Sequence, residues 1–137
     1  MKRVSKYTLL FSLIAVFFVS SCNKDNSTTQ LLTRASLKGT WVVNETFKKT
    51  TYEVTILIDS TTSNGVLISN FAGAGQNVKA VAYLSGVKLA LTSNELLSNG
   101  WIVNGSGTVT GTTRIDWPYS LHDGANLTTI QAVFTKE

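Results

Sequence analysis

From about residue 37 to the end of the chain, apolar and polar side chains alternate. Tyr52, Val54 and Ile56, for example, are separated by single polar or charged residues. Successive side chains of a β-strand point to opposite faces, so this period of two predicts strands with one dry and one wet face. The segments are bounded by Gly, Asn, Ser and Asp, which are typical of turns. The pattern predicts eight strands, near residues 39–47, 51–59, 65–71, 78–84, 87–91, 100–110, 112–121 and 126–135.

The connections between these segments are short, which favours an antiparallel sheet. Residues 85–86 predict a two-residue hairpin, and residues 95–97 suggest one helical turn inside a loop. Pro118 is expected at a strand edge or a bulge, because proline cannot donate to a ladder. Eight short strands within about 100 residues favour an all-β domain, an eight-stranded antiparallel up-and-down barrel. A two-sheet sandwich is the alternative.

The N-terminal part of the chain follows a different pattern. Lys2, Arg3 and Lys6 precede an almost wholly apolar run at residues 7–19. This run is shorter than the roughly 20 residues of a membrane-spanning helix, and its length is typical of the apolar core of a signal peptide. We therefore predict a cleaved N-terminal signal peptide at residues 1–21. Residues 22–36 are polar and predict a flexible tether, which leaves residues 37–137 for the barrel domain.

Small residues precede the only cysteine of the chain: Val19, Ser20 and Ser21 stand directly before Cys22. This segment resembles the lipobox of bacterial lipoproteins. The resemblance implies that Cys22 begins the mature protein and carries acyl chains such as palmitate, and two or three such chains anchor a protein stably. We therefore expect a lipid-anchored protein of the bacterial cell envelope, with the outer membrane favoured, facing the periplasm or the cell surface. An ordinary secretory signal with an incidental cysteine is the alternative.

Removal of the signal peptide changes the charge of the chain. The full sequence has 12 basic and 8 acidic residues, and residues 1–21 contain three of the basic residues and none of the acidic ones. The mature chain therefore has a net charge of +1, which gives no reason to expect a nucleic-acid partner. With a single cysteine the domain has no disulfide, so packing must stabilise it.

Several short motifs resemble those of lipocalin-like (calycin) barrels, and of small lipocalin-like lipoproteins in particular. Residues 37–41 contain a Gly-x-Trp opening, and residues 52–56 read Tyr-x-Val-x-Ile. An Asn-Phe-x-Gly turn follows at 70–73, then Gly-x-Gly-x-Val at 105–109 and Ala-x-Phe at 132–134. The resemblance implies that Trp41 packs across the barrel floor at the start of the first strand.

The sequence favours neither catalysis nor a metal site. The domain has one histidine, His122, and no cysteine, whereas zinc sites use several nitrogen or sulfur ligands. His122 and Asp123 supply two residue types of a hydrolase triad, but there is no Gly-x-Ser-x-Gly nucleophile motif. We predict no catalytic residue, no cofactor and a loop role for His122.

Five side chains are candidates for contact with a ligand or partner. Glu45 shares a face with Trp41 and Val43, so it is either buried and paired, with Arg114 as a possible partner, or solvated at the barrel mouth, which we favour. The others are the aromatic residues Trp101, Trp117 and Tyr119. Exposed, these rings would suit stacking on a glycan or an envelope protein; buried, they would belong to the core, which we favour.

These observations predict a non-enzymatic binding or interaction module anchored to the cell envelope. The alternative form is a carrier of a small apolar ligand in the barrel, because eight strands enclose either a filled core or one small ligand. A hydrolase is the third possibility and has the least support.

Overall fold

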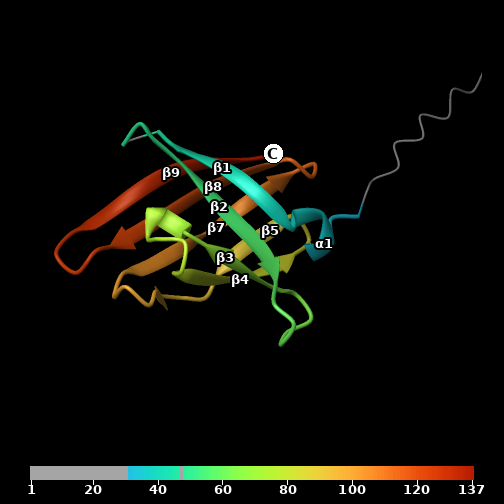
Figure 1. The fold of residues 1–137 in the computed structure, drawn as a ribbon, viewed down its shortest axis with the longest axis horizontal. Coiled ribbons are helices and arrows are strands. Elements are labelled where there is room, and N and C mark those ends of the chain that lie inside the picture. Colours follow the sequence, from blue (N-terminus) through green and yellow to red (C-terminus); the bar gives the residue numbers. More distant parts are fainter. Residues whose placement is uncertain (1–30, 47) are drawn as a thin grey trace, which may run out of the picture.

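The computed structural model describes residues 31–46 and 48–137. The predicted signal peptide, the lipidation site Cys22 and most of the predicted tether lie outside the described residues, as does Phe47. Nine strands make up most of the described chain (Figure 1): β1 (Gly39–Glu45), β2 (Thr50–Ile58), β3 (Gly65–Ser69), β4 (Lys79–Ser85), β5 (Lys88–Leu91), β6 (Glu95–Leu96), β7 (Ile102–Thr110), β8 (Arg114–His122) and β9 (Leu127–Lys136). Two short helices accompany them, the α-helix α1 (Arg34–Leu37) and the 3₁₀ turn η1 (Phe71–Gly73).

Eight of the strands form a closed antiparallel barrel. The hydrogen-bonded order is β5-β4-β3-β2-β1-β9-β8-β7-β6, and a further pairing of β5 with β7 closes the ring. Nearly all neighbours in this ring are consecutive in sequence, which is an up-and-down arrangement. The predicted eight-stranded lipocalin-like barrel is therefore confirmed, and the sandwich alternative is wrong.

Alternation along each strand fills the barrel interior. On β8, the inward residues are buried and apolar, whereas the outward residues between them are charged, polar or proline. The four largest fully buried side chains are aromatic: Trp41, Trp117, Phe71 and Phe134. The first three come from β1, β8 and η1, and the fourth from β9. Residues distant in sequence thus meet in one core, and Trp41 belongs to it as the resemblance implied.

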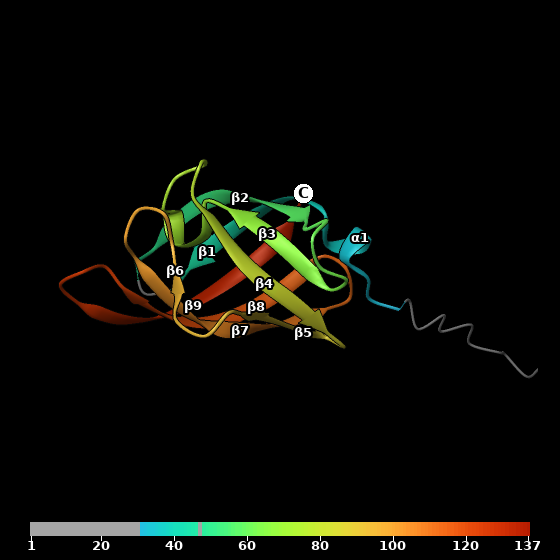
Figure 2. The same ribbon diagram turned by 90° about the horizontal axis from the view of Figure 1, so that it is seen from below.

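Helix α1 closes one end of the barrel. Thr33 and Ser36 form a reciprocal capping box at its start, and its last residue, Leu37, is fully buried. Nη1 of Arg34 donates to the carbonyl oxygens of Asp59 and Thr62 at 2.8 Å, which ties the helix to the loop after β2. Residues 34–36, placed by the sequence at the end of the tether, are thus part of this helix on the barrel. Figure 2 shows α1 and η1 at opposite ends of the molecule.

Residues 95–97 do not form the suggested helical turn. Glu95 and Leu96 pair with β7 as the short strand β6, and Leu97 is buried. Strand β5 ends at Leu91 and leaves the backbone N–H of Val81, on β4, without a strand partner. Oε1 of Glu95 accepts from this N–H at 3.1 Å, which holds residues 95–96 in an extended conformation. The loop therefore completes the wall where β5 is too short to do so.

Pro118 lies inside the barrel wall rather than at an edge, because β8 has β7 on one side and β9 on the other. The paired residues of β7 and β8 are interrupted between Gly105–Tyr119 and Thr108–Asp116, next to this proline. A Cβ on Gly105 would lie 2.6 Å from the carbonyl oxygen of Pro118, so only glycine allows this close approach of the two backbones.

Within the described ranges, no helix is long and apolar enough to cross a bilayer.

Candidate functional site

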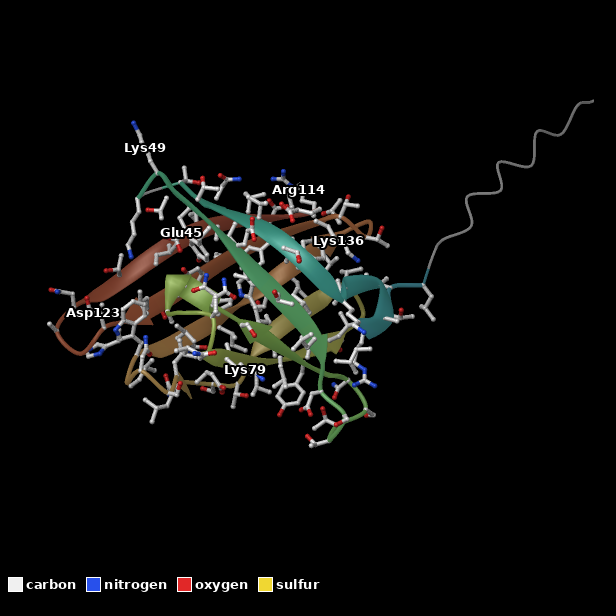
Figure 3. The ribbon with its side chains drawn as sticks, viewed as in Figure 1. Glu45, Lys49, Lys79, Arg114, Asp123 and Lys136 are labelled. Atoms are coloured by element: carbon white, nitrogen blue, oxygen red, sulfur yellow. The ribbon has the colours of Figure 1, made fainter. Side chains whose placement is uncertain are left out.

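A carboxylate is buried at the end of the barrel that η1 covers. Glu45 is the last residue of β1, and the alternation that turns Trp41 and Val43 inward also turns Glu45 inward. Only 3% of its surface is exposed, so the expectation that Glu45 is solvated at the barrel mouth is wrong. Figure 3 shows Glu45 close to η1. A buried carboxylate must be hydrogen-bonded or paired, and its partners therefore define the site.

Two tyrosine hydroxyls donate to the same carboxylate oxygen. Oη of Tyr52, on β2, lies 2.7 Å from Oε1 of Glu45, and Oη of Tyr119, on β8, lies 2.6 Å from it. Burial raises the pKa of Tyr52 far above its ordinary value, and the hydrogen bond to Glu45 raises it further. Burial also raises the pKa of Tyr119, with further contributions from Tyr52 and Glu45. Both phenols therefore keep their protons at neutral pH and act as donors.

The turn η1 places an aromatic ring over this cluster. The ring centroid of Phe71 lies 4.9 Å from that of Tyr119, 5.2 Å from that of Trp117 and 6.1 Å from that of Phe134. Asn70 anchors the turn, since its side-chain amide donates to the carbonyl of Glu53 at 2.7 Å and accepts from the backbone N–H of Gly75. Phe71 therefore closes this end of the barrel.

The backbone of this turn is strained. Asn70 and Ala72 both have left-handed conformations, with φ values of 62° and 58°. This region is unfavourable for residues with a Cβ, and asparagine tolerates it better than alanine does. The hydrogen-bonded residues 45, 52 and 119 are thus covered by a turn that the conformation of Ala72 makes less stable.

A buried indole N–H at this site has no acceptor. Trp117 is fully buried, and its Nε1 is the one buried side-chain nitrogen or oxygen without a hydrogen-bond partner in the described part of the chain. A Cβ on Gly107 would lie about 3 Å from Cδ2 and Cε3 of Trp117, so that edge of the ring rests on β7.

Arg114 is not a partner of Glu45. Its guanidinium lies on the outer face of β8 and pairs with Asp116, at 2.6 Å from Nη2 to Oδ1. Figure 3 shows Arg114 on the outside of the barrel, apart from Glu45. The physical reason is the alternation of β8, which turns residues 115, 117 and 119 inward and residues 114 and 116 outward.

The aromatic candidates are divided between core and surface. Trp117 and Tyr119 are buried, as favoured from their shared face, so neither is available for stacking on a surface glycan or protein. Trp101 precedes β7 and is half-buried against the core. His122 is the last residue of β8, so the predicted loop position is wrong by one residue. With Asp123 it holds the turn that follows: Nδ1 of His122 accepts from the N–H of Gly124, and Asp123 accepts from two further backbone amides.

Sequence reasoning missed two residues of this site. Tyr52 was recognised only as part of an alternating strand, although that alternation turns it to the side of the buried Val54. Phe71 was recognised only as part of the Asn-Phe-x-Gly turn. An aromatic residue in a turn between strands was the available signal, since turns otherwise carry polar residues.

The arrangement gathers several hydrogen-bonding groups in one place. It offers one carboxylate acceptor, two protonated phenols and one free indole donor, inside aromatic walls. The described residues contain no group of three or more His, Cys, Asp or Glu that could hold a metal ion.

Comparison with known proteins identifies no family. No family model matches the chain, and no curated protein matches it. Two similar solved structures are EF1p2_mFAP2b bound to DFHBI and a redesigned β-barrel, b11L5F_LGL. The first is 14% identical with a TM-score of 0.52, and the match covers 75% of this chain and 95% of the other. The second is 12% identical with a TM-score of 0.54, and the match covers 79% and 97%. At these identities the likeness concerns the fold alone: the chain is a closed antiparallel β-barrel.

Proposed function

We propose that this chain is a lipid-anchored, non-enzymatic binding module of the bacterial cell envelope, whose ligand site is the barrel end covered by η1. The observation that carries the proposal is the buried carboxylate of Glu45 with its two tyrosine donors. Ligand sites combine apolar walls with a few placed polar groups. This end of the barrel has both, in the aromatic rings around Phe71 and the hydrogen-bonded carboxylate of Glu45.

The polar groups suit recognition better than catalysis. General acid–base catalysis needs a group whose pKa lies near the working pH. The pKa values of Tyr52 and Tyr119 are raised away from that range, so both phenols stay protonated. We therefore assign them as fixed hydrogen-bond donors that orient Glu45, and Glu45 as the group that contacts the ligand.

The predicted lipid anchor and the candidate site are at opposite ends of the barrel. The described chain begins beside α1, and the site lies at the opposite end of the barrel (Figure 2). A lipid on Cys22, before α1 in the chain, would therefore leave the site free to face away from the membrane. Fractionation of cells that produce Cys22→Ser tests this part: we expect a soluble or uncleaved protein, and a processed, membrane-bound variant would contradict the anchor.

Native mass spectrometry tests the ligand site. The full-length chain is extracted in detergent from the membranes of a bacterium and compared with Glu45→Gln and with Asp116→Asn, a carboxylate-to-amide change on the outer wall. We expect a co-purified small molecule on the parent and on Asp116→Asn that is reduced on Glu45→Gln. Equal occupancy of all three would contradict a site at Glu45.

A second candidate function is docking of an envelope protein on the outer wall. Leu96, Ile102, His122 and Leu127 are paired in register across β6, β7, β8 and β9. The two leucines are 67% and 72% exposed and the isoleucine is 36% exposed, so they form an apolar row on the surface. Loss of a cross-linked envelope partner in Leu96→Ser with Leu127→Ser, but not in Glu45→Gln, would favour this function over ligand binding.

A further inference from the structure

Glu45, Ala132 and Trp117 lie side by side across three neighbouring strands. Glu45 of β1 is opposite Ala132 of β9, and Ala132 is opposite Trp117 of β8. All three side chains are buried in the barrel interior. Because Ala132 contributes only a methyl group, the carboxylate and the indole face the same part of the interior with no large wall side chain between them.

Two hydrogen-bonding groups of this row are open to a ligand. Both tyrosines donate to Oε1 of Glu45, so neither uses Oε2. The Nε1–H of Trp117 has no acceptor. The one ion pair within the described residues joins Arg114 to Asp116, so no basic side chain there neutralises Glu45. A ligand that matched the row would supply a donor, preferably a cationic one, for Oε2 and an acceptor for the indole.

Phe71 now occupies the aromatic part of this site. Its ring packs against Trp117, Tyr119 and Phe134, and Trp117 and Phe134 are themselves 5.4 Å apart. A phenyl ring can neither donate to the carboxylate nor accept a conventional hydrogen bond from the indole. The ring therefore fits between the aromatic side chains, but it offers no donor to Glu45 and no acceptor to Trp117.

The ring of Phe71 can leave its place while Asn70 stays anchored to the wall. Asn70 is bonded to the carbonyls of Glu53 and Val78, whereas the bonds within η1 are local, from Gly73 N–H to the carbonyl of Asn70 and from Ala74 N–H to that of Phe71. The left-handed conformation of Ala72 is unfavourable, so movement of the turn that allows Ala72 an ordinary conformation would release strain.

We propose that the ligand is a small planar nitrogen heterocycle, and that its ring takes the place of the Phe71 ring. This rests on the proposed function and extends it to a ligand class. An amino or ring N–H of the ligand donates to Oε2 of Glu45, and a ring nitrogen or carbonyl accepts from Nε1–H of Trp117. Tyr119 and Phe134 pack on its faces and edges, as they now pack around Phe71.

Indole NMR of the full-length chain tests this proposal. The chain is labelled with [¹⁵N]tryptophan, held in detergent micelles and titrated with cytosine, with 2-aminobenzimidazole and with indene, which has a similar shape but no polar group. Trp117→Phe assigns the resonance of Trp117. Trp41 is an internal control, because its Nε1–H is already bonded to the carbonyl of Leu37 at 2.8 Å, near α1. We expect a saturable shift of the Trp117 resonance with a nitrogen heterocycle, and none for Trp41.

Three variants make the test specific. Glu45→Gln should weaken heterocycle binding about tenfold or more, because a charge-assisted hydrogen bond is lost. Asp116→Asn, on the outer wall, should leave binding unchanged. Phe71→Leu keeps an apolar plug but weakens its aromatic packing, so it should strengthen binding.

Two results would overturn the proposal. If indene shifts the Trp117 resonance as strongly as the heterocycles do, the site is apolar and the donor–acceptor pairing is wrong, while a binding function stands. If no probe shifts that resonance in the parent or in Phe71→Leu, heterocycle binding at this site is wrong. The native mass spectra of the parent and Glu45→Gln decide the proposed function separately.

Discussion

The two ends of the barrel are closed in different ways. At the α1 end the polar groups are paired: Trp41 donates to Leu37, Arg34 donates to backbone carbonyls, and Nζ of Lys136 donates to the carbonyl of Ser36 at 2.6 Å. Lys136 also lies 5.7 Å from the centre of the Trp41 ring, within cation–π range. This end has the features of a structural seal.

At the η1 end, closure leaves the indole N–H of Trp117 without an acceptor and the backbone strained. Trp117 is as fully buried as Trp41, yet its N–H has no acceptor. Glu45 receives two donors on one oxygen, and Ala72 is left-handed. Two buried tryptophans in one barrel thus differ in a single hydrogen bond. The difference separates an end whose polar groups are paired from the end at which we propose that a ligand binds.

High pH should produce the largest effect, through the two buried tyrosines of the η1 end. The pKa values of Tyr52 and Tyr119 are raised in the fold above the ordinary value of 10.0. The unfolded chain therefore loses these protons first, and the free energy of unfolding is fully retained below about pH 10 and falls above it. We expect a loss of about 1.4 kcal/mol per pH unit for each tyrosine in urea unfolding.

Single phenylalanine variants check the source of this pH dependence. Tyr52→Phe or Tyr119→Phe should reduce the slope of the free energy of unfolding against pH above pH 10. Tyr83→Phe, on β4 and away from the cluster, is the control and should leave that slope unchanged. An unchanged slope in both cluster variants would show that these phenols are not protected by the fold.

Substitution of the two buried tryptophans should show the next largest difference. Trp41→Phe and Trp117→Phe remove similar volumes, but only Trp41→Phe breaks a hydrogen bond and leaves a carbonyl unpaired. That bond is worth about 1–2 kcal/mol, so Trp41→Phe should lower the free energy of unfolding by that much more than Trp117→Phe does. Denaturant unfolding measures both, and a greater loss in Trp117→Phe would contradict the contrast between the ends.

A pair of alanine-to-glycine changes should have smaller effects of opposite sign. Ala72→Gly removes a Cβ from a left-handed residue and should stabilise the fold by about 0.5–1 kcal/mol. Ala35→Gly, in α1, removes a Cβ from a helical residue and should destabilise the fold by a similar amount. Thermal unfolding compares them. Destabilisation by Ala72→Gly would mean that the turn stores no strain.

The outer-wall ion pair should matter least. Arg114→Ala removes the partner of Asp116, but the two side chains are 52% and 47% exposed and solvent weakens their attraction. We expect no measurable change in the urea concentration at the midpoint of unfolding. A measurable decrease would point to a role for Arg114 that its position on the outer face does not explain.

The sequence predicted the parts of this molecule that depend on local pattern. A period of two located the eight barrel strands, and their short connections indicated the barrel, because both signals arise within a few residues. The same period already separated Arg114 from Trp117 and Tyr119, so the suggested pairing of Arg114 with Glu45 conflicted with a pattern that was readable in the sequence.

The burial of Glu45 could not be predicted in the same way. Its hydrogen bond with Tyr119 joins residues 74 positions apart, and its cover is a turn between two other strands. Both depend on closure of the barrel. Helix α1 and strand β6 have four and two residues, which is too short for any periodic signal. The candidate site is therefore the part of the barrel that long-range contacts define.

Hydrogen exchange of the two buried indoles, followed by NMR on the full-length chain, tests the central contrast most directly. If the η1 end opens while the α1 end stays sealed, the indole proton of Trp117 should exchange at least about tenfold faster than that of Trp41. Equal rates, or faster exchange of Trp41, would contradict the account that the η1 end is the one that opens.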